Sequence, residues 1–256
     1  MKIGHCNNPR RDLIEEVRWI GEHGFDFLDL FLEADRALPE SIDMVMLKDL
    51  LLEYSLPLVA HAAWYLPLGS PMEGLRRKAV QIVQGYFTLL EKLNCRYLTV
   101  HANWPSDLFT AEEGILFQVE SLTQLTETAR NFGIRILYEP LEGRRDTLKN
   151  LARILKQVQD LLIHVDIGHA HIRGIQPAQY FKAFPGRIAH MHLHDNNGLA
   201  DLHLPLGAGK INWKHTIRQI KKAYDGTITL EIFSRDREYV LISKKKLREL
   251  WDDAAG

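Results

Sequence analysis

The sequence predicts an α/β protein built as a single (β/α)8 TIM barrel, and three observations support this prediction. Short apolar segments rich in β-branched residues alternate with longer amphipathic segments along the whole chain. About eight such repeats occur, which favours closure of a parallel sheet into a barrel over an open sheet. The length of 256 residues is typical of one barrel, so we expect a single domain over residues 1–256.

Eight segments have the length and apolar content of strands that are buried on both faces. They are Lys2–Cys6, Phe25–Phe31, Pro57–Ala62, Tyr97–Ala102, Arg135–Glu139, Leu162–Ile167, Ile188–His194 and Thr227–Phe233.

A segment with helical spacing follows each of these strands. The first is Asp12–His23, in which Leu13, Val17 and Ile20 share one face and Gly24 ends the helix. The others are Asp43–Tyr54, Gly74–Leu93, Glu112–Phe132, Thr147–Val158, Pro177–Phe184, Trp213–Ala223 and Ser243–Trp251.

Composition and charge exclude several classes of protein. The formal net charge of -1 gives no overall positive field for nucleic acid, which makes such a partner unfavoured without excluding it. No apolar run approaches the length of a membrane span and the first residues have no signal-peptide pattern, so we expect a cytoplasmic protein without a membrane partner. The first strand is not followed by a dinucleotide-binding or nucleoside-triphosphate-binding motif.

Several predicted strands carry polar side chains on the face that would point into the barrel. In Thr227–Ile232, for example, Ile228, Leu230 and Ile232 share one parity, which leaves Glu231 on the inner face. The same reasoning assigns further polar residues to the inner face: His61, Thr99, His101, Glu139, His164, Asp166, His190, His192 and His194.

Buried charges are costly unless they are paired or bound to metal, and these residues cluster near the carboxyl ends of their strands. That end carries the active site in TIM barrels. Histidine and carboxylate ligands suit zinc, manganese, cobalt or iron. We therefore predict a divalent-metal site there, with His164 and His190 lying deeper as supporting residues.

At these residues the sequence resembles the xylose-isomerase-like TIM-barrel superfamily, which includes sugar isomerases, sugar epimerases and type IV apurinic endonucleases. The matching segments are AHAAWYLPLGS, LTVHANWP, LYEPLEG, HVDIGHAH, HMHLHDNNG, ADLHLPLGAGKINW and LEIF. Their order along the chain and their positions at strand ends carry the resemblance, which spans nearly the whole sequence.

The two branches of this superfamily imply different sites. The epimerase branch implies one catalytic metal held by Glu139, Asp166, His192 and Glu231, with His169 contacting the substrate. The endonuclease branch implies a cluster of three zinc ions. Its ligands are those five residues together with His61, His101, Asp201 and His203.

The loop after the second predicted strand favours the small-substrate branch. Type IV endonucleases carry a basic and aromatic loop there, whereas this chain has FLEADRALPESID, in which Arg36 is the only basic residue. We therefore expect a metal-dependent isomerase or epimerase acting on a sugar or sugar phosphate through an enediolate, with Glu139 and Glu231 transferring the proton. A zinc-dependent phosphodiesterase or apurinic endonuclease is the alternative.

Four further residues are candidates for substrate binding. Trp64 and Trp104 follow the third and fourth strands and either wall a sugar pocket or pack beneath the loops. Arg145 and Lys210 lie in loops at the catalytic face and either bind a phosphate or remain solvated. The expected cofactor is one to three divalent ions of manganese, zinc, cobalt or magnesium, and the sequence does not decide among them. It also does not decide whether the protein is a homo-oligomer.

Overall fold

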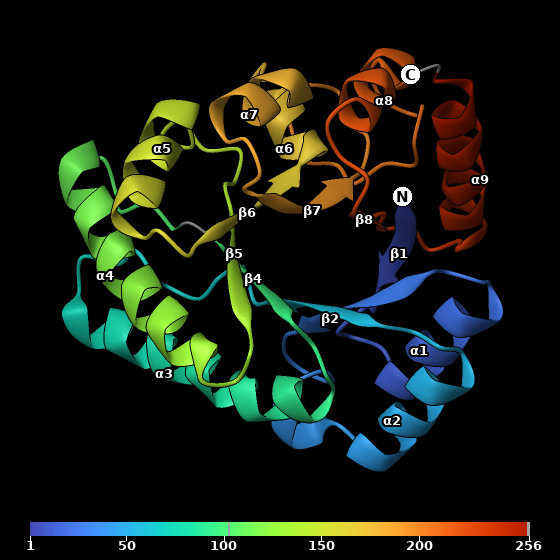
Figure 1. Ribbon diagram of the computed structural model, residues 1–256, viewed down its shortest axis with the longest axis horizontal. Helices are drawn as coiled ribbons and strands as arrows, with labels where there is room; N and C mark the ends of the chain where they lie inside the picture. Colours follow the sequence, from blue (N-terminus) through green and yellow to red (C-terminus); the bar gives the residue numbers. More distant parts are fainter. Residues whose placement is uncertain (102, 255–256) are drawn as a thin grey trace.

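The computed structural model describes residues 1–101 and 103–254 and has eight parallel strands that close into one barrel. Figure 1 shows the strands around the centre and the helices outside them. The strands are β1 Lys2–Cys6, β2 Phe27–Leu32, β3 Leu58–Ala62, β4 Tyr97–His101, β5 Arg135–Glu139, β6 Leu162–Asp166, β7 Ile188–Leu193 and β8 Thr227–Leu230. The predicted (β/α)8 barrel is therefore confirmed.

Helices cover the outside of the barrel, and each predicted helix is present within a few residues of its expected bounds. They are α1 Leu13–Glu22, α2 Met44–Glu53, α3 Glu73–Lys92, α4 Ala111–Arg130, α5 Leu148–Gln157, α6 Ile167–Ile172, α7 Pro177–Ala183, α8 Trp213–Lys221 and α9 Glu238–Asp253, with a short 3-10 helix at Pro39–Ser41. The last helix begins five residues earlier than the sequence predicts, at Glu238, and Val240 in its first turn lies on the same buried face as Ser243, Leu247 and Trp251.

Three strands, β6, β7 and β8, end earlier than predicted, and hydrogen bonds beyond the strand ends explain two of these cases. The β6 strand ends at Asp166, because this carboxylate accepts a hydrogen bond from the backbone N–H of His169 and so caps α6, a helix that the sequence reading missed. Beyond β8, the backbone N–H of Phe233 donates to the carbonyl of His203 in the loop after β7. The predicted end of the fourth strand, Ala102, lies outside the described residues.

The apolar core lies between the barrel and its helices, whereas the barrel interior is polar. Leu28, Leu98, Ile136 and other strand residues of that parity are buried in the hydrophobic cluster. The opposite parity carries polar residues that are fully buried, namely Asp29, Thr99, His164, His190, His192 and Thr229. Most TIM barrels fill this space with branched apolar side chains. The polar interior of this barrel therefore indicates that these residues support the polar site at the strand ends.

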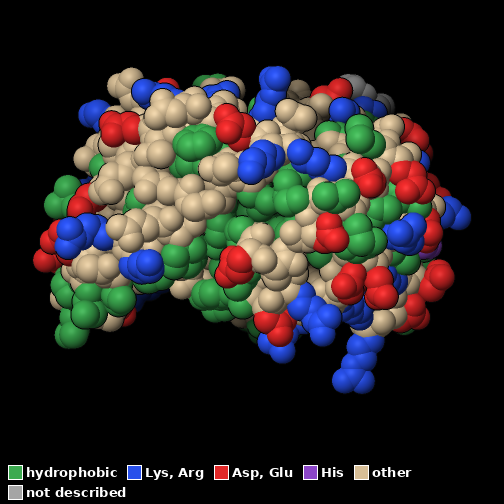
Figure 2. Space-filling model, turned by 90° about the horizontal axis from the view of Figure 1, so that it is seen from below, with side chains coloured by type: hydrophobic (Ala, Val, Ile, Leu, Met, Phe, Trp, Pro, Cys, Tyr) green, Lys and Arg blue, Asp and Glu red, His purple; other side chains and the backbone are tan. Residues whose placement is uncertain are grey.

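The outer surface of the barrel is mixed in character. Figure 2 views the side on which α2 and α3 lie in Figure 1, and it shows hydrophobic side chains interspersed with charges of both signs. Val45 and Leu52 on α2 are 71% and 78% exposed. Within the described part of the chain, no helix combines the length and apolar character needed to cross a membrane.

Candidate active site

The polar side chains of six neighbouring strand ends, from β3 to β8, meet at the mouth of the barrel. Strand pairing places His101 beside Glu139 and Asp166 beside His192, and it places Phe31 beside His61. Glu231 directly follows β8 and its backbone N–H still bonds to the carbonyl of Leu193. The inward direction predicted from parity is therefore confirmed for these residues, whose side chains are all buried.

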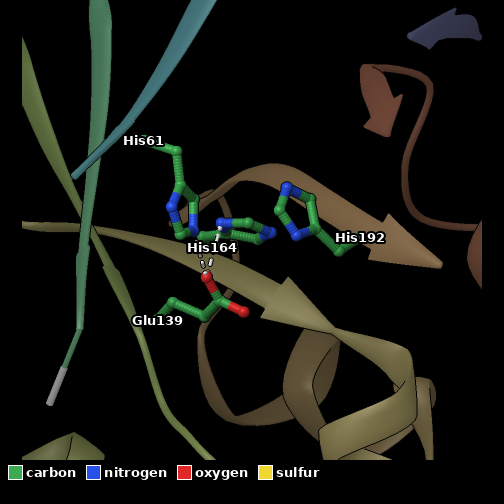
Figure 3. Close-up of side chains that lie close together, drawn as sticks. All are labelled: His61, Glu139, His164 and His192. Carbon is green, nitrogen blue, oxygen red and sulfur yellow. Dashed lines mark hydrogen bonds and ion pairs between the residues drawn. The ribbon is translucent and has the colours of Figure 1, made fainter. Parts of the chain in front are cut away.

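Glu139 is surrounded by imidazole rings. Its Oε2 atom lies 3.0 Å from His61 Nε2, 3.2 Å from His164 Nδ1 and 3.6 Å from His101 Nε2. Figure 3 shows His61 and His164 facing this carboxylate, with His192 beyond them. Burial by itself would raise the pKa of Glu139, but the adjacent His164 and His101 hold it well below its usual range. This carboxylate is therefore ionised.

A second group lies around His192. Its Nδ1 atom is 3.0 Å from Glu231 Oε2 and 4.0 Å from Asp166 Oδ2. Burial opposes ionisation of Asp166, yet nearby His194 and His169 lower its pKa to about 2. Three carboxylates, those of Glu139, Asp166 and Glu231, are thus held charged although they are only 1%, 2% and 7% exposed.

A third group is centred on Asp201, in the loop between β7 and α8. Its Oδ2 atom lies 2.8 Å from His203 Nε2 and 3.3 Å from His169 Nε2, and its Oδ1 atom lies 3.3 Å from His194 Nε2. His203 has a φ of 46°, in the left-handed region. The loop therefore carries two of the predicted ligands back over the strand ends.

The donor set fits a divalent cation. Ligand atoms of His61, Glu139, His164 and His192 lie within 4.8 Å of one another, as do those of Asp166, His192 and Glu231. Several buried atoms at the site have no hydrogen-bond partner among the described residues: His61 Nδ1, His101 Nδ1, Asp166 Oδ2, His169 Nδ1 and Asp201 Oδ1. Unsatisfied buried polar atoms are rare in native proteins, and imidazole with carboxylate suits zinc, manganese, cobalt or iron.

A cavity of about 450 Å³ opens onto these residues. Its wall includes seven of the predicted site residues, His61, His101, Glu139, His169, Asp201, His203 and Glu231, together with Trp64. The indole of Trp64 is 56% exposed, so it forms part of the rim. A cavity of this size is typical of a site that binds a small molecule.

The protein family is decided by comparison of the whole chain with known proteins. A family model described as a xylose isomerase-like TIM barrel matches residues 17–254. The chain belongs to this family.

Relatives and solved structures extend this assignment. A fructoselysine 3-epimerase from Escherichia coli O157:H7 is 23% identical and aligns with 91% of this chain and 90% of its own. A solved D-tagatose 3-epimerase-like protein has a TM-score of 0.89 at 28% identity, covering 99% of this chain and 98% of that one. A third protein, crystallised with a binding zinc atom, has a TM-score of 0.78 at 16% identity and covers 99% of this chain and 96% of that one.

The described lining of this cavity does not include three of the four residues that the sequence predicts to bind substrate, namely Trp104, Arg145 and Lys210. Trp104 instead donates its indole N–H to Asp146, and Arg145 donates to the carbonyls of Pro105 and Phe109. Lys210 is exposed in the loop before α8. The loops use Trp104 and Arg145 for their own packing, and of the four candidates only Trp64 lies at the described cavity wall.

The sequence reading missed two acidic residues and one histidine. Asp29 is fully buried under His192, and its place in the strand FLDLFL, where it interrupts an apolar run, could have revealed it. His194 was assigned inward without a role, yet its Nε2 atom lies 3.1 Å from Asp166 Oδ1. Glu33 directly follows β2 and lines the cavity. Apart from its charge, nothing in the sequence around it indicates a site residue.

Proposed function

We propose that this protein is a divalent-metal-dependent sugar epimerase or isomerase. The observation that carries the proposal is the pair of buried carboxylates, Glu139 and Glu231, which line one cavity while each belongs to a donor group that contains His192. Epimerase activity in the relative and the epimerase-like solved structure supports the same class of reaction.

The two glutamates would exchange the proton of the carbon next to the substrate carbonyl. Glu139 and Glu231 have pKa values below the usual range despite burial, so either carboxylate is ready to accept a proton. One takes the proton from one face of the carbon and the other returns a proton to the opposite face, which inverts the configuration. Each carboxylate turns Oε2 toward a histidine at 3.0 Å, and Oε1 of Glu139 lies 3.5 Å from His169 Nδ1.

Four residues would hold the catalytic cation: Glu139 from one donor group, Asp166 and Glu231 from the other, and His192, which belongs to both. When bound, a divalent cation polarises the carbonyl and the neighbouring hydroxyl and offsets the negative charge of the enediolate. Imidazole together with carboxylate ligands is compatible with manganese, zinc or cobalt. Magnesium is also a candidate, because it binds carboxylate oxygens.

Two residues at the wall would orient the sugar. The backbone N–H of His169 bonds to Asp166, and its ring lies between Glu139 and Asp201 at the cavity wall, where it would contact the substrate. Trp64 offers an exposed indole face on which the apolar face of a sugar can pack.

Proton exchange measured by NMR in heavy water tests the function directly. Metal-loaded protein is incubated with a panel of ketoses and aldoses, and we expect deuterium to enter the carbon next to the carbonyl. Glu139→Gln and Glu231→Gln should each slow this exchange by roughly 10² to 10⁴, the usual contribution of a general acid or base. Glu127→Gln, an exposed change on α4, is the matched control and should exchange at the wild-type rate. Wild-type protein that exchanges no proton of any sugar in the panel would refute the proposal.

A zinc-dependent phosphodiesterase, possibly acting at abasic sites in DNA, is the second candidate. It is favoured by the additional donor groups, Asp166 with His169 and His194, and His194 with Asp201 and His203, which offer ligands for further ions. The acidic loop after β2 opposes it, because Asp35, Glu40 and Asp43 would repel phosphates. Cleavage of a duplex with one abasic site by the zinc-loaded protein would establish this activity, and an intact duplex would exclude it.

A further inference from the structure

A second, smaller cavity adjoins the active-site cavity between the loops that follow β1 and β8. Its volume is about 270 Å³, and Asn8 and Phe233 line both cavities. It therefore lies on the catalytic face of the barrel, beside the proposed sugar site. We call it the arginine annex, because Arg11, Arg235 and Arg237 line it.

One buried carboxylate organises the annex. Glu16 on α1 is 5% exposed and forms ion pairs with Arg237 and with Arg11, in the latter case at 3.7 Å between Arg11 Nη1 and Glu16 Oε1. Its Oε2 atom accepts a hydrogen bond from the backbone N–H of Asn8 at 3.0 Å. Glu16 thus fixes two guanidinium groups and the loop between β1 and α1 in one arrangement.

The annex retains donors and positive charge beyond what Glu16 uses. Three guanidinium groups and one carboxylate line it, and each guanidinium carries five N–H donors. The guanidinium carbon of Arg237 lies 4.9 Å from the centre of the Trp19 ring, and this stacking restricts its plane. A fixed guanidinium with free N–H groups is suited to a phosphate, which accepts two parallel hydrogen bonds from it.

The position in the fold points to the same ligand. The 16-residue helix α9 begins immediately after Arg237, and the side chain of Asp236 accepts a hydrogen bond from the backbone N–H of Glu238 in its first turn. The positive end of a helix near the last strand of a TIM barrel is a common phosphate site. Arg235 follows Glu231 by four residues, so their Cα atoms are at most ~14 Å apart, within the span of a sugar phosphate and an arginine side chain.

We propose that the arginine annex binds the terminal phosphate of a sugar phosphate whose carbonyl end lies between Glu139 and Glu231. This inference rests on the proposed function and narrows its substrate class to phosphorylated sugars. A phosphate dianion matches the excess of guanidinium groups over carboxylates in the annex, whereas a neutral sugar hydroxyl would leave these charges unpaired.

Titration calorimetry with inorganic phosphate tests the annex without any turnover. The metal-loaded wild type is compared with Arg11→Gln/Arg235→Gln, which leaves Arg237 in place so that Glu16 keeps its partner. The control, Arg77→Gln/Arg96→Gln, makes the same charge change at two exposed residues away from both cavities. We expect at least tenfold weaker phosphate binding in the annex variant and an affinity within twofold of wild type in the control. Equal affinity in all three proteins, or no binding to wild type at millimolar phosphate, overturns the inference.

A kinetic comparison tests whether the phosphate belongs to the substrate. The ketose that shows proton exchange is compared with the same ketose phosphorylated at its last carbon. We expect kcat/KM of wild type to be at least tenfold higher for the phosphate ester, and this preference to fall below threefold in the annex variant. Equal kcat/KM for both compounds overturns the inference while the proposed function stands. If no sugar exchanges a proton, the proposed function fails and the phosphate titration still decides whether the annex binds phosphate.

Discussion

His192 contacts the carboxylate of Asp29 with one ring nitrogen and faces the candidate metal site with the other. Its Nε2 atom lies 2.8 Å from Asp29 Oδ2, and its Nδ1 atom lies 3.0 Å from Glu231 Oε2. Thr229 also donates to Asp29 Oδ2, at 2.8 Å. A proton on Nε2 satisfies Asp29 and leaves the lone pair of Nδ1 for a cation, which is the role of the carboxylate partners of metal-bound histidines.

Replacing Asp29 by asparagine should weaken metal binding by about 10- to 100-fold, because the imidazole loses the charged partner that orients it. Competition between the protein and a fluorescent chelator measures this affinity. The matched control is Asp49→Asn, an exposed change on α2, which should bind metal as the wild type does. Unchanged affinity in Asp29→Asn, with an unchanged circular dichroism spectrum, would show that Asp29 has no role in positioning His192.

Removal of metal should lower the melting temperature. The buried carboxylates of Glu139, Asp166 and Glu231 lie close together, and a cation offsets their mutual repulsion. A cation at 100 times its Kd adds about 2.7 kcal/mol to stability, which corresponds to roughly 5 to 10 °C for a chain of this size. Scanning calorimetry before and after treatment with a chelator measures the shift, and adding the metal back should restore it. An identical melting temperature in both states would argue against a metal site.

The number of bound ions separates the two candidate functions. We expect close to one exchangeable ion per chain in protein purified without chelator, measured by plasma mass spectrometry, if Glu139, Asp166, His192 and Glu231 hold the catalytic cation. Two or three tightly bound zinc ions would favour the phosphodiesterase, because they would also occupy the group around Asp201.

Trp64→Ala should raise KM by roughly 3- to 10-fold with little change in kcat, because stacking on a sugar contributes about 0.5 to 1.5 kcal/mol and acts on binding. Steady-state kinetics on the active sugar provide the measurement. Tyr239→Ala, which removes another exposed aromatic group outside the lining of the cavity, is the control. A fall in kcat with KM unchanged would contradict the assigned role.

Asp146 should make the folded protein less stable as the pH rises from about 4 to about 6. Burial raises the pKa of Asp146 from 3.8 to about 6, so in this range the folded protein retains a proton that the unfolded chain has released. The loss amounts to roughly 3 kcal/mol.

Asp146→Asn removes this titration while keeping an acceptor for the indole of Trp104. Its stability relative to wild type should therefore increase between pH 4 and pH 7, as measured by urea unfolding at both values. Asp49→Asn should show a constant difference from wild type, and a constant difference for Asp146→Asn would contradict the assignment.

The alternation of strands and helices was sufficient to predict the barrel, because parallel strands buried on both faces leave a clear apolar signal. The boundaries that failed depend on hydrogen bonds that the apolar pattern of the strands does not report. The β8 strand ends early where Phe233 bonds to His203, and α6 begins where Asp166 caps it. The first bond joins residues that are far apart in the sequence, whereas the second is a local cap that the apolar residues on both sides of Asp166 concealed.

The sequence by itself determined which residues could form the site, since strand parity places Glu139, Asp166, His192 and Glu231 on the inner face wherever the strands close. Only the tertiary structure decided what the loops contribute. It places Trp64 at the cavity, uses Arg145 to hold loop carbonyls, and gathers Arg11, Arg235 and Arg237 beside the site. The physical reason is that a strand fixes side-chain direction through its period of two, whereas a loop residue takes its direction from contacts with remote segments.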